Sequence, residues 1–92
     1  MIRSFADKRT ELVWRRRQAR LPHDVARQAW KKLAMLDQAD NLNDLRVPPG
    51  NRLEQLRGDR EGQHSIRIND QYRICFVWTD HGPTSVEIVD YH

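Results

Sequence analysis

The sequence contains a single cysteine, no long apolar run and few lysines. Because Cys75 stands alone, an internal disulfide and any metal site built from several thiolates are excluded. No segment approaches the roughly 20 apolar residues of a membrane span. The first residues also lack the apolar core of a signal peptide. We therefore expect a protein of the reducing cytoplasm, without a membrane partner.

Positive charge is present mainly as arginine. The chain has 16 basic and 13 acidic residues, a net charge of +3, and 13 of the basic residues are arginines. Residues 1–20 alone hold seven basic and two acidic groups. The planar guanidinium suits recognition of phosphate, and a basic surface favours nucleic acid through counterion release. The composition therefore favours a nucleic-acid partner.

The length of 92 residues predicts one domain, residues 1–92, without internal repeats. "MIRSF" predicts a short strand, and Asp7 is the expected N-cap of a helix that begins at about Lys8. A second helix is expected from Pro22 to about Asp37, followed by a loop up to Asn51. Alternating apolar residues then predict three strands, at 64–69, 71–78 and 84–91. The expected fold class is α+β, with an N-terminal strand and two helices on one face of a small, mostly antiparallel sheet whose other face is open.

The chain ends with three polar, chemically capable side chains directly after an apolar run. The four histidines have no metal-ligand spacing and no phosphate-binding glycine loop is present, so we expect neither a metal nor a cofactor. Cleaving RNA through its own 2′-hydroxyl needs a base, an acid and a cation beside the phosphate. Histidine titrates nearest to neutral pH. The residues suited to this chemistry are Asp90, Tyr91, His92, Arg57 and Arg73.

Two features of this set leave alternatives open. Strand alternation places Asp90 and His92 on one side of the last strand and Tyr91 on the other, unless the chain leaves the sheet. Arg73 lies within an apolar strand, so its guanidinium must reach water, a carboxylate such as Asp90, or a ligand phosphate. The structural interpretation of the ending is a strand that finishes in solvated polar residues.

Other arginines form candidate RNA contacts. Those near the end of the first helix are often a merely solvated basic face, but they also suit docking on ribosomal RNA through phosphates. The strand half adds arginines that reach the sheet surface. The full set of candidate RNA-binding residues is Arg15, Arg16, Arg17, Arg20, Arg57, Arg60 and Arg67.

The segment "GDREGQHSIRINDQYRICFVW", the ending "EIVDYH", the two helices and the opening "MIRSF" together resemble the HigB-type toxins of the RelE superfamily, which include the GraT toxin. The resemblance covers essentially the whole chain. It implies a RelE-like fold and a ribosome-dependent endoribonuclease that cleaves mRNA in the A site without a metal, and so inhibits translation and growth. It also implies a helix-turn-helix antitoxin of the HigA type, and operator DNA as a partner only through the toxin–antitoxin complex.

The resemblance assigns phosphate contact to Arg73 and catalysis to the ending Asp90, Tyr91 and His92. Arg57 stands where better-known members have lysine.

Glu54 departs from the pattern, because some members have a histidine at this place in the segment that reads "LEQL" here. A carboxylate can still serve as a catalytic base, but it repels a phosphate at close range. This departure argues against a two-histidine mechanism. Two other functions fit the residues: a non-catalytic nucleic-acid-binding module, and a protein-interaction domain of a larger complex.

Overall fold

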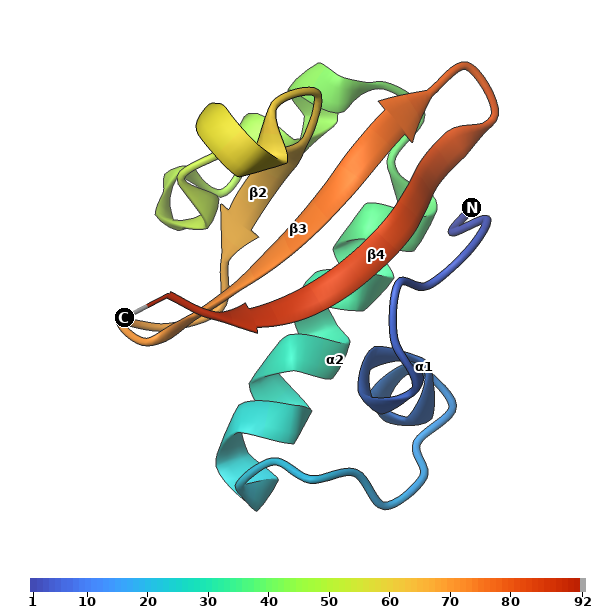
Figure 1. The fold of residues 1–92 in the computed structure, drawn as a ribbon, viewed down its shortest axis with the longest axis vertical. Coiled ribbons are helices and arrows are strands. Elements are labelled where there is room, and N and C mark those ends of the chain that lie inside the picture. Colours follow the sequence, from blue (N-terminus) through green and yellow to red (C-terminus); the bar gives the residue numbers. More distant parts are fainter. Residues whose placement is uncertain (92) are drawn as a thin grey trace.

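A computed structural model describes residues 1–91 of the chain. Two helices precede a four-stranded antiparallel sheet with the strand order β1-β2-β3-β4 (Figure 1). The helices and strands are α1 (Lys8–Trp14), α2 (His23–Gln38), β1 (Glu54–Gln55), β2 (His64–Arg67), β3 (Tyr72–Thr79) and β4 (Gly82–Asp90). Short 3-10 helices lie at Leu42–Arg46, Pro49–Asn51 and Gly58–Arg60, the first two within the expected loop. The predicted fold class is confirmed.

Both helices begin where the sequence predicts. The Asp7 carboxylate accepts a hydrogen bond from the backbone N–H of Thr10 at 2.9 Å, which satisfies one of the free donors of the first turn of α1. Pro22 has extended backbone angles and directly precedes α2. Among residues 1–91, neither α1 nor α2 has the length and apolar composition of a membrane-spanning helix.

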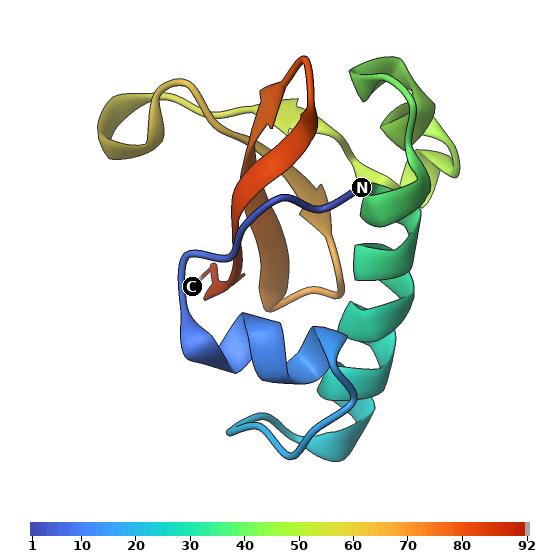
Figure 2. The ribbon, with the colours of Figure 1, turned by 90° about the vertical axis from the view of Figure 1, so that its right-hand side faces the viewer.

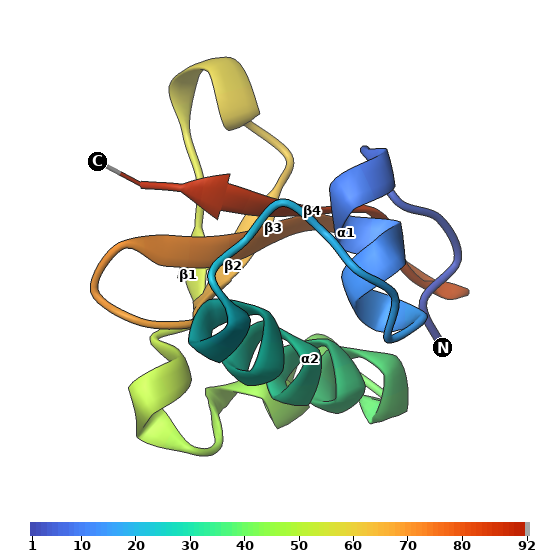
Figure 3. The ribbon, with the colours of Figure 1, turned by 90° about the horizontal axis from the view of Figure 1, so that it is seen from below.

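The core lies between the helices and one face of the sheet (Figure 3). One stripe of α2 and the inward positions of three strands are fully buried, and each Leu, Ile, Val or Phe side chain among them stabilises the fold by about 1.5–3 kcal/mol. The most buried members are Ala29, Leu33, Leu36, Ile66, Ile74, Phe76, Val86 and Ile88. Both helices thus occupy a single side of the sheet, as the sequence predicts.

The N-terminal segment differs from the prediction, because residues 1–5 form no strand of their own. Phe5 makes one isolated parallel bridge with Val86 of β4, and the chain then turns into α1 (Figure 2). The hydroxyl of the buried Thr10 accepts a hydrogen bond from the Ile88 N–H at 2.9 Å. The outer edge of β4 is thus covered in two parts, because Val86 exchanges backbone hydrogen bonds with Ser4 and Ala6, whereas α1 binds the backbone of Ile88.

The sheet face opposite the helices is not fully open. Residues 56–63 connect β1 to β2, and their turn at Gly58–Arg60 stands over this face, in yellow in Figure 1. Arg60 donates a hydrogen bond to the Glu87 carboxylate at 3.1 Å across this face. Ser65 and Cys75 are completely buried beneath. This segment covers one end of the face and leaves the end toward the C-terminus uncovered (Figure 1).

Candidate active site

Arg73 is a buried cation on the sheet face opposite the helices. It lies on β3 and is only 8% exposed. Its Nε donates a hydrogen bond to Ser65 Oγ at 2.8 Å, and its Nη2 donates to the carbonyl oxygen of Arg52 at 2.6 Å. Arg52 has a positive φ of 45°, and its carbonyl reaches the guanidinium. Because a buried charge is tolerated only when it is hydrogen-bonded, these contacts fix the orientation of the guanidinium.

Two further groups contact the guanidinium at the protein surface. Glu54 Oε1 lies 3.8 Å from Arg73 Nη2, and the Glu54 side chain is 54% exposed. The ring centre of Tyr91 lies 5.6 Å from Arg73 Cζ, within the range of a cation–π contact. Arg73 therefore faces one exchangeable carboxylate and one half-exposed aromatic ring. A phosphate that reached Arg73 would compete with Glu54 for the same donors.

The strand register explains this arrangement. Glu54 in β1 lies opposite Ser65 in β2, so both belong to the face that carries Arg73. Arg73 lies opposite Val89 in β4, and Tyr91 follows Val89 by two residues. Since side chains alternate along a strand, Tyr91 returns to the face of Arg73. Three candidates, Glu54, Arg73 and Tyr91, therefore lie together.

Asp90 is placed differently. It lies opposite Tyr72, and its Oδ2 accepts a hydrogen bond from Gln71 Nε2 at 2.9 Å. Alternation therefore directs Asp90 and Tyr91 to different sides, as the sequence predicts. The sequence suggested Asp90 as the carboxylate partner of Arg73, whereas the ion pair is with Glu54. His92 lies outside the described residues.

The remaining strand-side arginines lie on β2 and on the segment that connects β1 to β2. Arg67 lies directly opposite Arg73 in the β2–β3 pair and forms an ion pair with Asp70. Arg57 is exposed and directly precedes the turn at Gly58–Arg60. Arg60 is partly buried and donates hydrogen bonds to the side chains of Gln63 and Glu87. Arg60 and Arg67 thus share the sheet face of the immobilised Arg73.

Two shifted pKa values describe the surroundings. Burial raises the pKa of the Cys75 thiol, so this residue is a poor nucleophile at neutral pH. Burial, followed by the charge of Arg67, lowers the pKa of Lys32. No group of three or more His, Cys, Asp or Glu side chains suited to a metal ion occurs within residues 1–91.

The four arginines near the end of α1 do not join this cluster. Arg15 pairs with Glu11 at 3.0 Å, and the guanidinium of Arg16 lies 3.9 Å from the ring centre of Trp30 on α2. Arg17 and Arg20 are exposed. These residues lie with the helices, apart from the Arg73 face. The predicted RNA-binding set is therefore divided between two surfaces.

Sequence reasoning missed the two groups that hold Arg73. Alternation places Ser65 on the correct face, but nothing in the sequence indicates that its hydroxyl meets a guanidinium. The carbonyl of Arg52 carries no side-chain signal at all. Both contacts depend on the register of β1, β2 and β3, which residue patterns do not specify.

A family model described as the RelE-like toxin of the type II toxin–antitoxin system HigB matches residues 3–92. The chain belongs to this family. It is therefore a toxin of a type II toxin–antitoxin system, and HigB-like and RelE-like toxins are generally mRNA endoribonucleases.

Two individual proteins are also similar to this chain in sequence. Toxin HigB-1 of Vibrio cholerae is 42% identical over 82 residues, which cover 87% of this chain and 86% of that protein. An uncharacterized protein of Haemophilus influenzae is 37% identical over 60 residues, covering 65% of this chain and 59% of that protein. Among solved structures, the YoeB–YefM complex of Staphylococcus aureus contains a chain with a TM-score of 0.64 and 19% identity, over 100% of this chain and 95% of that one. At this identity the likeness establishes the fold.

Proposed function

We propose that this HigB-like toxin cleaves mRNA in the A site of translating ribosomes by acid–base chemistry without a metal. The observation that carries the proposal is the immobilised Arg73 guanidinium, which has a displaceable carboxylate on one side and an aromatic ring on the other. A cation held in place before the substrate arrives stabilises the charge that develops on the phosphate at little reorganisation cost. The toxin therefore acts in the cytoplasm, where ribosomes are.

The proposed roles follow from chemistry and position. Arg73 contacts the scissile phosphate, and the ring of Tyr91 stacks against the substrate beside it. His92 transfers protons, because histidine is in general the side chain that titrates nearest to neutral pH, and Asp90 orients it. The assignment of His92 depends on the sequence alone.

Glu54 completes the proposed catalytic group. We place it as the temporary partner of Arg73, which keeps the guanidinium oriented until the phosphate displaces the carboxylate. Its 54% exposure permits this movement, since the side chain can turn into solvent. The outer arginines would contact rRNA phosphates and so position the toxin; they are Arg15, Arg16, Arg17, Arg20, Arg57, Arg60 and Arg67.

We infer that the toxin is neutralised by a helix-turn-helix antitoxin of the HigA type, and that operator DNA is bound only by the complex. The support is family membership, together with the fold shared with a chain of the YoeB–YefM complex. The ribosome supplies substrate orientation that so small a domain lacks.

Substitution of the buried arginine tests the nuclease proposal. Arg73→Gln should abolish growth arrest on expression and remove new mRNA 5′ ends on translating ribosomes. Arg46→Gln, at an exposed arginine outside this face, is the matched control and should keep both effects. Thermal unfolding of each purified variant separates loss of activity from loss of fold. Full toxicity of a folded Arg73→Gln variant would contradict the proposed site.

A further inference from the structure

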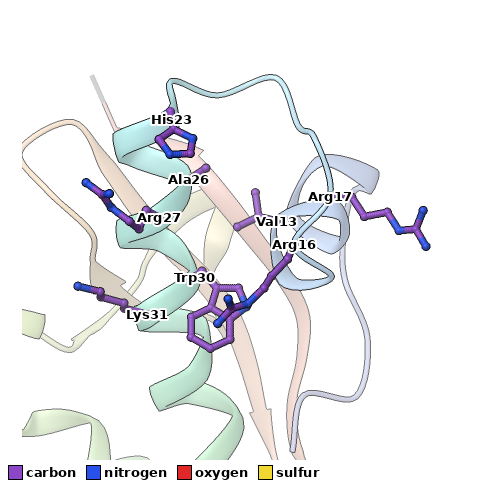
Figure 4. A pocket seen from close by; sticks show the side chains of 8 residues that line it. All are labelled: Val13, Arg16, Arg17, His23, Ala26, Arg27, Trp30 and Lys31. Atoms are coloured by element: carbon purple, nitrogen blue, oxygen red, sulfur yellow. The ribbon is translucent and has the colours of Figure 1, made fainter.

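A groove of about 380 Å³ lies between α1 and α2, apart from the Arg73 face. Figure 4 shows its lining, with Val13 from α1 facing Ala26 and Trp30 from α2. These three side chains make an apolar floor that no other part of residues 1–91 fills. Such a volume accommodates one or two large apolar side chains.

The indole of Trp30 is already engaged by the protein. Trp14 stacks on it with ring centres 5.7 Å apart, and Arg16 lies over the ring at 3.9 Å. Its N–H donates a hydrogen bond to the Trp14 carbonyl oxygen at 3.2 Å. A nucleobase would have to displace Arg16 before it could stack here. The groove therefore suits an apolar side chain, which can pack against Val13 and Ala26 without a free ring face, better than it suits an RNA base.

Positive charges border the floor on both sides. In Figure 4, Arg17 extends outward on the α1 side, and Arg27 and Lys31 extend outward on the α2 side. Arg27 lies 3.5 Å from Asp24, but both side chains are mostly exposed, so this pair contributes little. Within residues 1–91, no carboxylate forms an ion pair with Arg16, Arg17 or Lys31. A ligand that crosses the groove would meet unpaired cations at both rims.

We propose that this groove binds an acidic segment of the antitoxin, which places an apolar side chain on the floor and carboxylates against the rims. The identity of the partner rests on the proposed function; the groove and its charges do not. Charge complementarity requires an acidic ligand, and the apolar floor requires a side chain rather than a bare phosphate. A segment seated here would also cover Arg16 and Arg17, so antitoxin binding and rRNA contact at this surface would exclude each other.

Reversal of the rim charges tests whether electrostatic attraction at the groove contributes to antitoxin binding. The double variant Arg17→Glu with Lys31→Glu should weaken binding of the purified antitoxin by roughly tenfold or more, measured by calorimetry at low salt. The matched control, Arg3→Glu with Arg46→Glu, changes the net charge equally at exposed positions outside the groove. An equal loss for the control pair would show diffuse attraction and overturn the proposal.

A steric block in the groove tests whether an apolar side chain of the antitoxin packs on its floor. Ala26→Trp fills the floor without changing the charge, so antitoxin binding should fall while growth arrest by the free toxin persists. Circular dichroism and thermal unfolding establish that the variant is folded; if it is not, Ala26→Met provides a smaller block for the same comparison. If the groove variants bind the antitoxin normally but lose association with ribosomes, the groove is an RNA surface and the proposal is wrong.

Wild-type and variant toxins together distinguish a wrong function from a wrong groove. If the wild-type chain neither arrests growth nor binds the antitoxin, the proposed function fails, and the antitoxin assignment of the groove fails with it. If the wild-type chain does both and all groove variants behave like it, the groove inference alone is overturned.

Discussion

The contact between Glu54 and Arg73 gives the sharpest test of the proposed site. Glu54→Gln keeps the size of the side chain and removes its charge, so a phosphate no longer competes with a carboxylate for the guanidinium. Two unit charges about 4 Å apart interact by about 1 kcal/mol in water and by about 4 kcal/mol at an effective dielectric constant of about 20. With an N–O distance of 3.8 Å and Glu54 half exposed, solvent screening favours the lower value.

A gain of about 1 kcal/mol corresponds to roughly fivefold tighter substrate binding. The measurement is cleavage of a defined mRNA on programmed ribosomes over a range of ribosome concentrations, from which kcat and KM are obtained separately. We expect KM to fall and kcat to stay within about twofold of the wild-type value. The advantage of the variant should shrink at high salt, because ions screen the exposed carboxylate.

Glu61→Gln is the matched control, because it makes the same charge change at an exposed residue of the covering segment. It should leave KM nearly unchanged. An equal fall of KM in both variants would mean that net charge alone is responsible. A large fall of kcat in Glu54→Gln, with KM unchanged, would refute the reasoning, because Glu54 would then accept a proton in the reaction.

Three further predictions concern stability. Gly82 has a φ of 117°, and an added Cβ would lie 2.4 Å from the Met1 carbonyl oxygen. Gly82→Ala should therefore lower the free energy of unfolding by at least about 1 kcal/mol in urea titrations, whereas Gly50→Ala, which has open space, should change it little. Thr10→Val removes a buried acceptor of a β4 amide, so urea unfolding should show a loss of about 1–3 kcal/mol; a smaller loss would mean that the amide finds another partner. Burial lowers the pKa of His64, so the unfolded chain binds the proton more tightly and wild-type stability falls as the pH drops below about 6.5. His64→Phe should reduce this pH dependence, and an unchanged difference between urea midpoints at about pH 7.5 and about pH 5.5 would contradict the assignment.

Local signals in the sequence predict the elements well. The carboxylate of Asp7 and the fixed backbone of Pro22 mark the beginnings of both helices, because capping depends on neighbouring residues only. Alternation within the 64–69 and 71–78 segments correctly separates the apolar core face from the face of Arg73. Helix starts and strand faces depend on residues that are only a few positions apart in the sequence.

The partners of Arg73 depend on contacts between distant residues and were not predictable in this way. Glu54 reaches the guanidinium because β1, only two residues long, pairs with Ser65. The register of β3 against β4 shifts between Cys75 and Val77. Counting alternate residues from the β3–β4 turn therefore does not predict which face of the sheet Tyr91 lies on. Hydrophobic alternation predicts which side of the sheet a residue of a given strand faces. It does not predict which residue of a neighbouring strand lies beside it.

The buried Arg73 and the exposed arginines differ in how much order a ligand must impose on them. Arg73 has lost its conformational freedom on folding, since Ser65 and the Arg52 carbonyl already hold its guanidinium. Exposed arginines such as Arg17 and Arg57 must be ordered by the ligand, at about 0.5–1.5 kcal/mol each, and their attraction is screened by salt. Arg73 is therefore suited to a phosphate that must be held in one geometry. The exposed arginines suit partners that are attracted from a distance and bound over a wide area.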